Sequence, residues 1–252
     1  MSELEFHRAL ALGVIATGAA VFVTLFFIDA PYGRHARQGW GPEISNRLGW
    51  VMMESPSALF FAAVYAAGPH ALEPVPLLFC ALWLTHYGYR AFVYPFRLPN
   101  TKKRMPFAIS AMAIVFNVIN AYLNARWLSA LGSYPLAWLA APWCWVGIAA
   151  FVSGLALNIH ADNILLALRK PGEQGYKVPQ GGPFRWLSAP NYAAEIVEWG
   201  GFALATLSLA GFAFFFFTAA NLVPRALAHH RWYQKTFPDY PKERRAIVPF
   251  VW

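Results

Sequence analysis

Apolar segments of this sequence contain side chains that could carry chemistry. Glu54 lies near the start of one such segment, and a carboxyl group there must be protonated or hydrogen-bonded, because an isolated charge in an apolar medium is costly. In another segment, Tyr87, Arg90 and Tyr94 are spaced i, i+3 and i+7, so they share one face of a helix. A belt of interfacial tyrosines would not account for an arginine on that face. Glu54 and this face are therefore candidates for binding a polar group of a ligand.

A polar stripe is also expected on a later helix. Asn158, Asp162 and Arg169 are spaced i, i+4 and i+11, which places them on one side of an α-helix. The stripe leads into L-R-K-P-G-E at 168–173 and Y-K-V-P-Q-G-G at 176–182. Basic side chains and glycine backbone together can hold phosphate groups. This region is therefore a candidate anion-binding site.

Asn191, Glu195 and Glu198 form a further polar face, because they are spaced i, i+4 and i+7. An amide and two carboxylates on one face cannot all point at lipid, so they should also face a cavity. Two buried carboxylates could bind a metal ion. However, His160 is the only histidine within an apolar segment in that half of the chain. We therefore expect no metal site.

These residues must be positioned by helices that cross a membrane. The chain has 252 residues, of which 58% are hydrophobic and 13% are charged, whereas soluble domains carry about 25% charged residues. A membrane-spanning helix needs about 20 mostly apolar residues. We expect one all-α domain over residues 1–252, a bundle of seven transmembrane helices. The predicted spans are 9–29, 50–68, 75–95, 106–128, 135–165, 191–208 and 210–228.

The net charge of +8 has a topological explanation. Lysine and arginine concentrate in alternate connections, and the positive-inside rule assigns such connections to the cytoplasm. The basic stretches are 30–49, 96–105, 169–190 and the tail from 225. We therefore expect the N-terminus outside and the C-terminus in the cytoplasm, in a bacterial inner membrane or the endoplasmic reticulum, and no nucleic-acid partner. The acidic N-terminus lacks the basic start of a signal peptide, so the first apolar run is expected to be retained.

Common nucleotide and metal motifs are missing from the sequence. It has no G-x-G-x-x-G after a strand, no G-x-x-x-x-G-K-[ST] and no H-E-x-x-H. Any nucleotide must therefore be held by the helical bundle. Cys80 and Cys144 both lie in apolar segments, where we expect them to be buried packing residues. The residues alone indicate a polytopic membrane protein with an internal polar cavity, which both an enzyme and a transporter would fit.

Several of these stretches resemble the steroid 5α-reductase family. The resemblance covers nearly the whole chain in one order, which makes it highly specific. The matching stretches are P-Y-G-R-H at 31–35, E-S-P-S at 54–57, H-Y-G-Y-R-A-F-V-Y at 86–94, N-I-H-A-D-N-I-L at 158–165, L-R-K-P-G-E at 168–173, Y-K-V-P-Q-G-G at 176–182, N-Y-A-A-E-I-V-E-W-G at 191–200, A-L-A-T at 203–206, H-H-R-W-Y-Q-K-T-F-P-D-Y-P-K at 229–242 and R-A-I-V-P-F at 245–250.

The resemblance implies an activity and a set of site residues. It implies seven transmembrane helices and the NADPH-dependent reduction of the Δ4 double bond of a 3-oxo steroid to a 5α product. It further implies that Glu54 and Tyr87, the expected catalytic residues, bind the C3 carbonyl of the steroid. The implied cofactor-binding positions are Asn158, Asp162, Arg169, Tyr176, Asn191, Glu195, His229 and Tyr233, with Tyr32, Arg34 and Arg225 as further contacts.

One departure from the family leaves the substrate open. Met112 stands where the resemblance implies an arginine early in the fourth span, so contacts to the substrate can differ. A related membrane reductase of polyprenols or enoyl thioesters is one alternative, and a membrane methyltransferase of the isoprenylcysteine type is another. A transporter or lipid-binding membrane protein would use the same cavity without chemistry. We expect a monomer that binds a steroid or another apolar lipid within the membrane.

Overall fold

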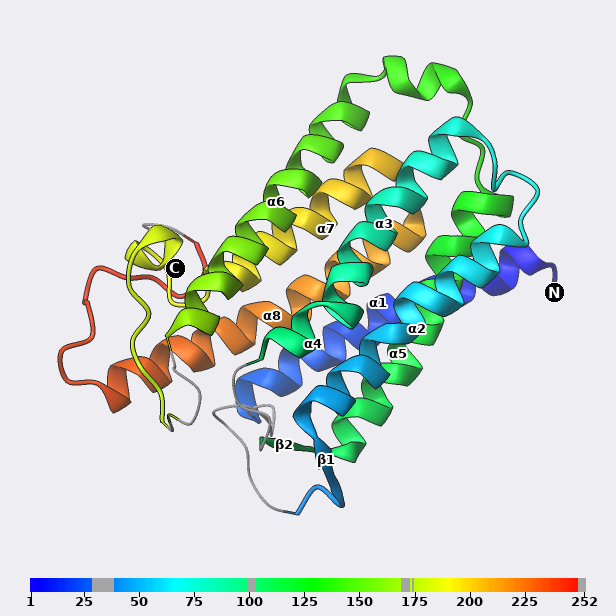
Figure 1. The fold of residues 1–252 in the computed structure, drawn as a ribbon. Helices are drawn as coiled ribbons and strands as arrows, with labels where there is room; N and C mark the ends of the chain where they lie inside the picture. Colours follow the sequence, from blue (N-terminus) through cyan, green and yellow to red (C-terminus); the bar gives the residue numbers. More distant parts are fainter. Residues whose placement is uncertain (29–38, 99–102, 169–172, 174, 249–252) are drawn as a thin grey trace.

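The computed structural model describes residues 1–28, 39–98, 103–168, 173 and 175–248, which form an inclined bundle of long helices (Figure 1). Seven long helices occur within these residues, in the order in which the sequence predicts them. They are α1 (Glu3–Phe27), α2 (Asn46–Ala66), α3 (Pro74–Phe92), α5 (Phe107–Arg126), α6 (Pro142–Ala167), α7 (Pro190–Thr206) and α8 (Leu209–Thr236). Shorter elements are α4 (Tyr94–Arg97), strands β1 (Glu43–Ser45) and β2 (Arg104–Pro106), a π-turn at Trp127–Leu131 and 3-10 turns at Leu136–Ala140 and Gly182–Arg185.

Local sequence signals set the helix boundaries. Ser2 caps α1 in a capping box with Glu5, as expected for a serine three residues before a glutamate. Pro142 opens α6, because proline suits the first turn, where its missing N–H has no helical partner. The span predicted at 135–165 is therefore wrong at its start. Between α7 and α8, Leu207 adopts a positive φ of 42° and Ser208 caps the next helix, which confirms the predicted break at this point.

Glycine lets α6 and α7 approach closely, and the two helices lie side by side along most of their length (Figure 1). A Cβ atom at Gly147 would lie 2.5 Å from the backbone nitrogen of Ala205, and one at Gly154 would lie 2.5 Å from that of Glu198. Contacts this close are possible only without a side chain, and small residues at such spacing are typical of membrane helix pairs. The α6–α7 pair is therefore a tightly packed unit.

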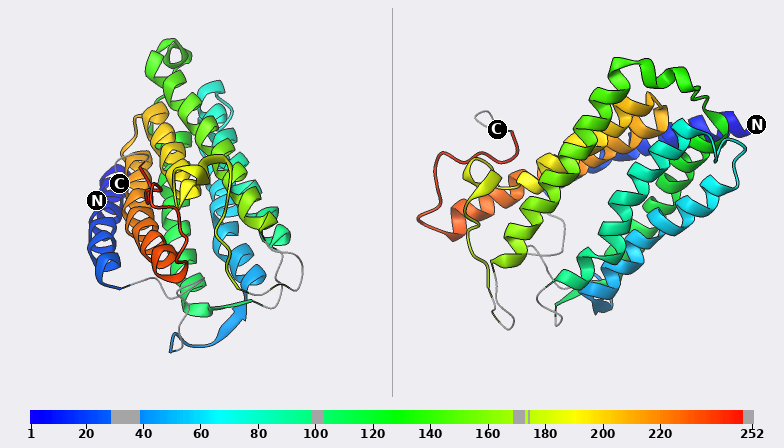
Figure 2. Two further views of the ribbon diagram at one scale, coloured as in Figure 1. Left: turned by 90° about the vertical axis from the view of Figure 1, so that its left-hand side faces the viewer. Right: turned by 45° about the horizontal axis from the view of Figure 1, so that its top comes forward.

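The other long helices are α2, α3 and α5, which form a second group, and α1 and α8, which pack against each other. Helix α2 packs against α3 and α5, while α1 lies along α8, and α8 also contacts α7. Figure 2 shows α2, α3 and α5 as one group beside the α6–α7 pair. Aromatic rings fill the centre, where Phe61 and Trp83 stack with centroids 4.7 Å apart and the tilted rings of Trp199 and Phe214 are 4.3 Å apart. The polar residues of interest lie at the edge of this aromatic core.

Helix length and composition indicate a membrane protein. Among the described residues, four helices are long and apolar enough to cross a membrane, namely α1, α5 continued to Leu131, α6 and α8. Outward-facing residues of α6 such as Trp145, Val146 and Val152 are more than half exposed, as expected for side chains that face lipid. Helix α7 has 17 residues, which is short for a membrane span.

The connecting segments differ at the two ends of the bundle. The end that holds β1, β2 and the C-terminal tail (Figure 1) also holds the basic connections of the described chain. Strands β1 and β2 pair antiparallel, with Ile44 opposite Met105. This small sheet was not predicted, because three-residue strands carry no periodic signal. At the opposite end, Arg126 pairs with Glu3, so the N-terminal helix is tied to α5.

Candidate functional site

A buried histidine–carboxylate pair joins α3 to α7. His86 Nδ1 and Glu198 Oε1 lie 2.6 Å apart, and the two side chains are 5% and 0% exposed. Within the described part of the chain, the other oxygen of Glu198 has no hydrogen-bond partner. A buried carboxylate needs a charged or hydrogen-bonded partner, and His86 supplies it from a helix 112 residues away in sequence.

Arg90 makes a second connection between the same parts of the bundle. Its guanidinium lies 3.0 Å from Asp162 of α6 and 4.0 Å from Glu195 of α7. The same group lies over the rings of Trp50 and Tyr94, with 4.7 Å to each ring centroid. Arginine suits this place because its planar cation stacks on aromatic rings while it binds carboxylates. The arginine that an aromatic belt could not explain is therefore an internal ligand of two carboxylates.

Four of the predicted cofactor residues gather around Arg90. Asn158 Nδ2 donates to the backbone carbonyl of Asn191 at 2.9 Å and to Glu195 at 3.4 Å. Asn191 Nδ2 donates in turn to Asp162 Oδ1 at 3.2 Å. Asn158 and Asp162 are buried, whereas Asn191 and Glu195 are partly exposed. Because the close α6–α7 packing brings the two polar faces together, they form one cluster of amides and carboxylates.

Tyr87 and Glu54 lie next to this cluster. The ring of Tyr87 is enclosed by Trp83 at 5.0 Å, His86 at 4.9 Å and Trp199 at 5.7 Å between centroids. Glu54 of α2 is partly exposed, and it interacts electrostatically with Tyr87. The structure therefore brings together the two predicted catalytic residues, which come from neighbouring helices.

The turn of α2 that carries Glu54 is held by α5. Pro56 lies within α2 and removes one backbone hydrogen bond from this turn. Asn117 Nδ2 donates to the backbone carbonyl of Met53 at 2.5 Å. An amide from another helix therefore stabilises the turn where α2 is interrupted. The sequence analysis did not single out Asn117, because an asparagine in an apolar helix does not reveal which carbonyl it meets.

A second group of predicted residues lies at the basic end of the bundle. Tyr192 of α7 receives a hydrogen bond of 2.9 Å from Arg225, and its ring lies 5.4 Å from that of His229. Tyr176 lies near Lys103, whose Nζ is 3.5 Å from the tyrosine hydroxyl. Together with Tyr176, Arg225 and His229 add cationic and aromatic groups beyond the amide–carboxylate cluster.

The C-terminal tail folds back on this end of the bundle. Ser188 Oγ lies 2.6 Å from His230 Nδ1 and 2.7 Å from the hydroxyl of Tyr240. The rings of Tyr233 and Tyr240 stack, with centroids 5.2 Å apart. Burial raises the pKa of Tyr240, so its hydroxyl stays protonated. Arg244 is buried and donates to the backbone carbonyl of Pro179 at 2.9 Å. The predicted residue Tyr233 therefore lies in an ordered layer rather than in a free tail.

Three predicted site residues lie outside the described residues, namely Tyr32, Arg34 and Arg169. His86 and Glu198, by contrast, lie in the candidate site but were not among the predicted catalytic or cofactor-binding residues, although Glu198 was expected to face a cavity. The available signal was the position of each ionisable group inside an apolar helix. Within the described ranges, no three His, Cys, Asp or Glu side chains gather as a metal site requires.

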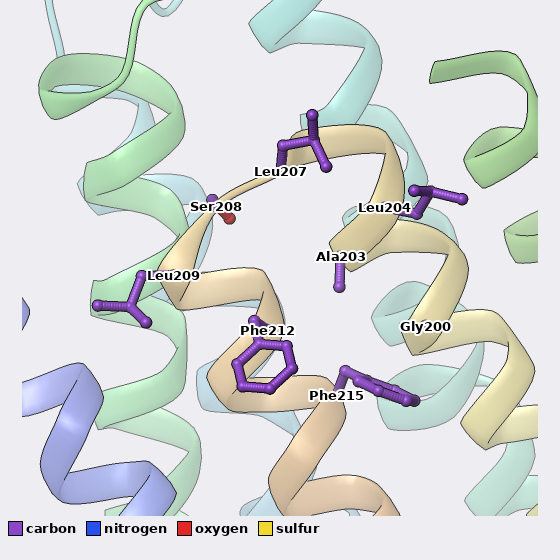
Figure 3. A pocket seen from close by; sticks show the side chains of 8 residues that line it. All are labelled: Gly200, Ala203, Leu204, Leu207, Ser208, Leu209, Phe212 and Phe215. Carbon is purple, nitrogen blue, oxygen red and sulfur yellow. The ribbon is translucent and has the colours of Figure 1, made fainter. Parts of the chain in front are cut away.

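An apolar groove lies between α7 and α8, apart from the polar cluster (Figure 3). Its volume is about 510 Å³. Phe212 and Phe215 lie in the space between the two helices (Figure 3), and Ser208 supplies the one polar side chain of the lining. With no ionisable or amide group in its lining, the groove lacks the means for acid–base or redox chemistry. The polar cluster is therefore the candidate active site.

Comparisons with known proteins place the chain in a family. Residues 103–252 match the family described as 3-oxo-5-alpha-steroid 4-dehydrogenase. Over its full length the chain is 40% identical to steroid 5-alpha-reductase DET2 of Arabidopsis thaliana, covering 99% of that protein. It is 41% identical to human 3-oxo-5-alpha-steroid 4-dehydrogenase 1, again over 100% of this chain and 97% of the relative. The DET2 protein of Gossypium hirsutum is 42% identical over 98% of this chain and 97% of its own length.

Proposed function

The chain belongs to the 3-oxo-5-alpha-steroid 4-dehydrogenase family of oxidoreductases, and we propose that it reduces the Δ4 double bond of a 3-oxo steroid with NADPH. One observation carries the proposal. Glu54 and Tyr87, which can polarise a carbonyl, lie beside the amide–carboxylate cluster of α6 and α7 within one helical bundle. Substrate and cofactor groups can therefore meet between α3 and the α6–α7 pair.

The residues of the cluster fit a nicotinamide cofactor. Asn158 and Asn191 offer amide donors and acceptors, and Asp162 and Glu195 offer acceptors, which are the groups that a carboxamide and ribose hydroxyls require. Toward the basic end, Arg225 is a cation able to meet phosphate groups. The order from amides to cations along the bundle thus matches the order from nicotinamide to phosphates in the cofactor.

The cofactor would supply the hydride on one side of the site, and Tyr87 and Glu54 would stabilise the charge on the steroid from the other side. NADPH, when bound, supplies the hydride that C5 of the steroid accepts. Negative charge then builds on the C3 oxygen, to which the hydroxyl of Tyr87 and a protonated Glu54 donate hydrogen bonds. Such donors act as an oxyanion hole, and the loss of one typically costs about 10²–10³ in rate. A proton from water then reaches C4. The aromatic rings around Tyr87 exclude water from the developing charge and suit a flat apolar substrate.

All seven long helices are proposed to span the membrane, with the N-terminus outside and the basic end in the cytoplasm. Arg47, Arg97, Lys177 and Arg185 at the basic end support this orientation. Helices α2, α3 and α7 carry Glu54, Arg90 and Glu195, and such polar groups make a helix less apolar than a simple anchor. Polar site residues therefore account for the weaker membrane signal of α2 and α3, and α7 is in addition short, with 17 residues.

The proposal is tested with detergent-purified protein, NADPH and a Δ4-3-oxo steroid such as testosterone or progesterone. NADPH oxidation that depends on the steroid, with a 5α product, is the expected result. NADPH binding without steroid turnover would redirect the search to polyprenols or enoyl thioesters. Binding of S-adenosylmethionine with no binding of NADPH would contradict the reductase and favour the methyltransferase.

A further inference from the structure

The two groups of helices that hold the site meet mainly through side chains. Helix α3 packs against α2, but its backbone has hardly any contact with α6 or α7. Tyr87 is on α3, while Asn158 and Glu195 are on α6 and α7. The distance between the group that polarises the steroid and the groups that hold the cofactor therefore depends on what connects α3 to the α6–α7 pair.

The shortest polar contact across this boundary is between His86 and Glu198, at 2.6 Å. Whichever of the two carries the proton, the contact is a hydrogen bond. Each partner is the sequence neighbour of an aromatic residue at the site. His86 precedes Tyr87 and makes an edge-on contact with its ring, while Glu198 precedes Trp199, whose ring also packs against that of Tyr87. A shift in the pair must therefore move the residues around the reacting carbonyl.

We propose that His86 and Glu198 are a positioning pair that sets the spacing between Tyr87 and the cofactor-binding side of the bundle. The catalytic effect of the pair rests on the proposed function, whereas its effect on helix spacing does not. Neither residue needs to touch the substrate. The pair acts through Tyr87 on one side and through the packing of α6 and α7 on the other.

The surroundings of the pair favour a geometric role over a purely stabilising one. Both side chains are buried, and one oxygen of Glu198 has no hydrogen-bond partner among the described residues. Because desolvation offsets much of the attraction, a buried ionic pair of this kind is often no more stable than apolar residues of similar volume. The charges of Arg90 and Glu195 also act on these two groups. Such a pair gives directional contact that apolar packing does not.

The spacing matters because hydride transfer is sensitive to distance. Reacting atoms must approach to about 3–3.5 Å, and a misplacement of about 1 Å can cost about 10²-fold in rate. Loss of the pair should therefore slow the chemical step more than it weakens the binding of either ligand.

Steady-state kinetics with Glu198→Gln and His86→Phe test this consequence. We expect kcat to fall by about 10- to 100-fold, while KM for the steroid changes much less. The deuterium isotope effect with NADPH labelled at C4 should rise, because hydride transfer becomes slower than the other steps. The reciprocal double variant His86→Glu with Glu198→His should recover part of the rate. Exposed His70, 2.7 Å from Glu73, offers a matched control, and His70→Gln should change nothing.

A distance measurement tests the pair without turnover. Spin labels at the exposed positions Leu77 of α3 and Val197 of α7, with both native cysteines replaced by alanine, report the spacing of the two helices. Glu198→Gln should shift or broaden the distance distribution, whereas the His70→Gln control should not. This measurement remains valid if the wild-type protein reduces no steroid, so a wrong reaction and a wrong role for the pair are distinguishable. An unchanged distribution, or slower turnover with an unchanged isotope effect, would overturn the proposal.

Discussion

Asn117 of α5 donates a 2.5 Å hydrogen bond to the backbone carbonyl of Met53, the residue before Glu54. Pro56 interrupts the hydrogen bonds of the same turn of α2. The position of the proposed catalytic carboxyl group therefore depends on a side chain from another helix.

We expect Asn117→Ala to lower activity by about tenfold. A single hydrogen bond contributes about 0.5–1.5 kcal/mol, and its loss removes the contact from α5 that holds the turn beside Glu54. The rate of steroid-dependent NADPH oxidation measures the effect. Asn124→Ala is the matched control, because Asn124 bonds only to Asn120 within its own helix among the hydrogen bonds described. Equal rates in the two variants would show that Asn117 does not hold the turn.

The oxyanion role of the two catalytic residues predicts a graded response. Tyr87→Phe removes a hydroxyl and keeps the ring, so kcat should fall by about 10²–10³. Glu54→Leu should have a similar effect, whereas Glu54→Gln retains an N–H donor and should lose less. Rates are measured at saturating NADPH and steroid. Near-normal turnover of both Tyr87→Phe and Glu54→Leu would exclude the assignment.

The sequence predicted the helices well but not the partners of their polar side chains. Seven apolar runs and a break near Ser208 could be located, because length and hydropathy are local signals. Asn191, Glu195 and Glu198 were expected to share one polar face. In the structure this face divides, since Glu195 bonds to Asn158 of α6 while Glu198 meets His86 of α3. Spacing along one helix identifies a face, but the helix that it meets depends on the packing of the whole bundle.

The same limit applies at the basic end of the bundle. The last span was predicted to end at residue 228, yet α8 continues through the following residues to Thr236. Its continuation is stabilised by contacts from distant residues, among them the Ser188–His230 contact. Contacts between positions about 40 residues apart leave no periodic pattern in the sequence.

Close packing of α6 and α7 predicts a strong difference between two glycines. Gly154→Ala places a methyl group about 2.5 Å from the backbone nitrogen of Glu198, and overpacking of this kind costs about 1–3 kcal/mol. Gly13→Ala in α1 meets nothing within 4 Å and should gain up to about 1 kcal/mol from helix propensity. Thermal unfolding in detergent should therefore show a lower Tm for Gly154→Ala and an equal or higher Tm for Gly13→Ala. Equal Tm values would mean that α6 and α7 can separate at little cost.

Arg90 offers a test of the cofactor side of the site. Arg90→Gln removes the cation that neutralises Asp162 and Glu195, and an uncompensated buried charge costs about 3–5 kcal/mol. We expect this variant to have a lower Tm and to bind NADPH more weakly, as measured by the change in protein fluorescence on titration.

The double variant Arg90→Gln with Asp162→Asn separates charge from shape. Because it removes one of the two carboxylates that Arg90 neutralises, it should recover part of the lost Tm. Affinity for NADPH should stay low, because the carboxylate of Asp162 is a proposed ligand of the cofactor and the amide that replaces it is neutral. Recovery of both Tm and affinity would assign Arg90 and Asp162 to stability alone. Recovery of Tm without affinity is what a cofactor site between α3 and the α6–α7 pair requires.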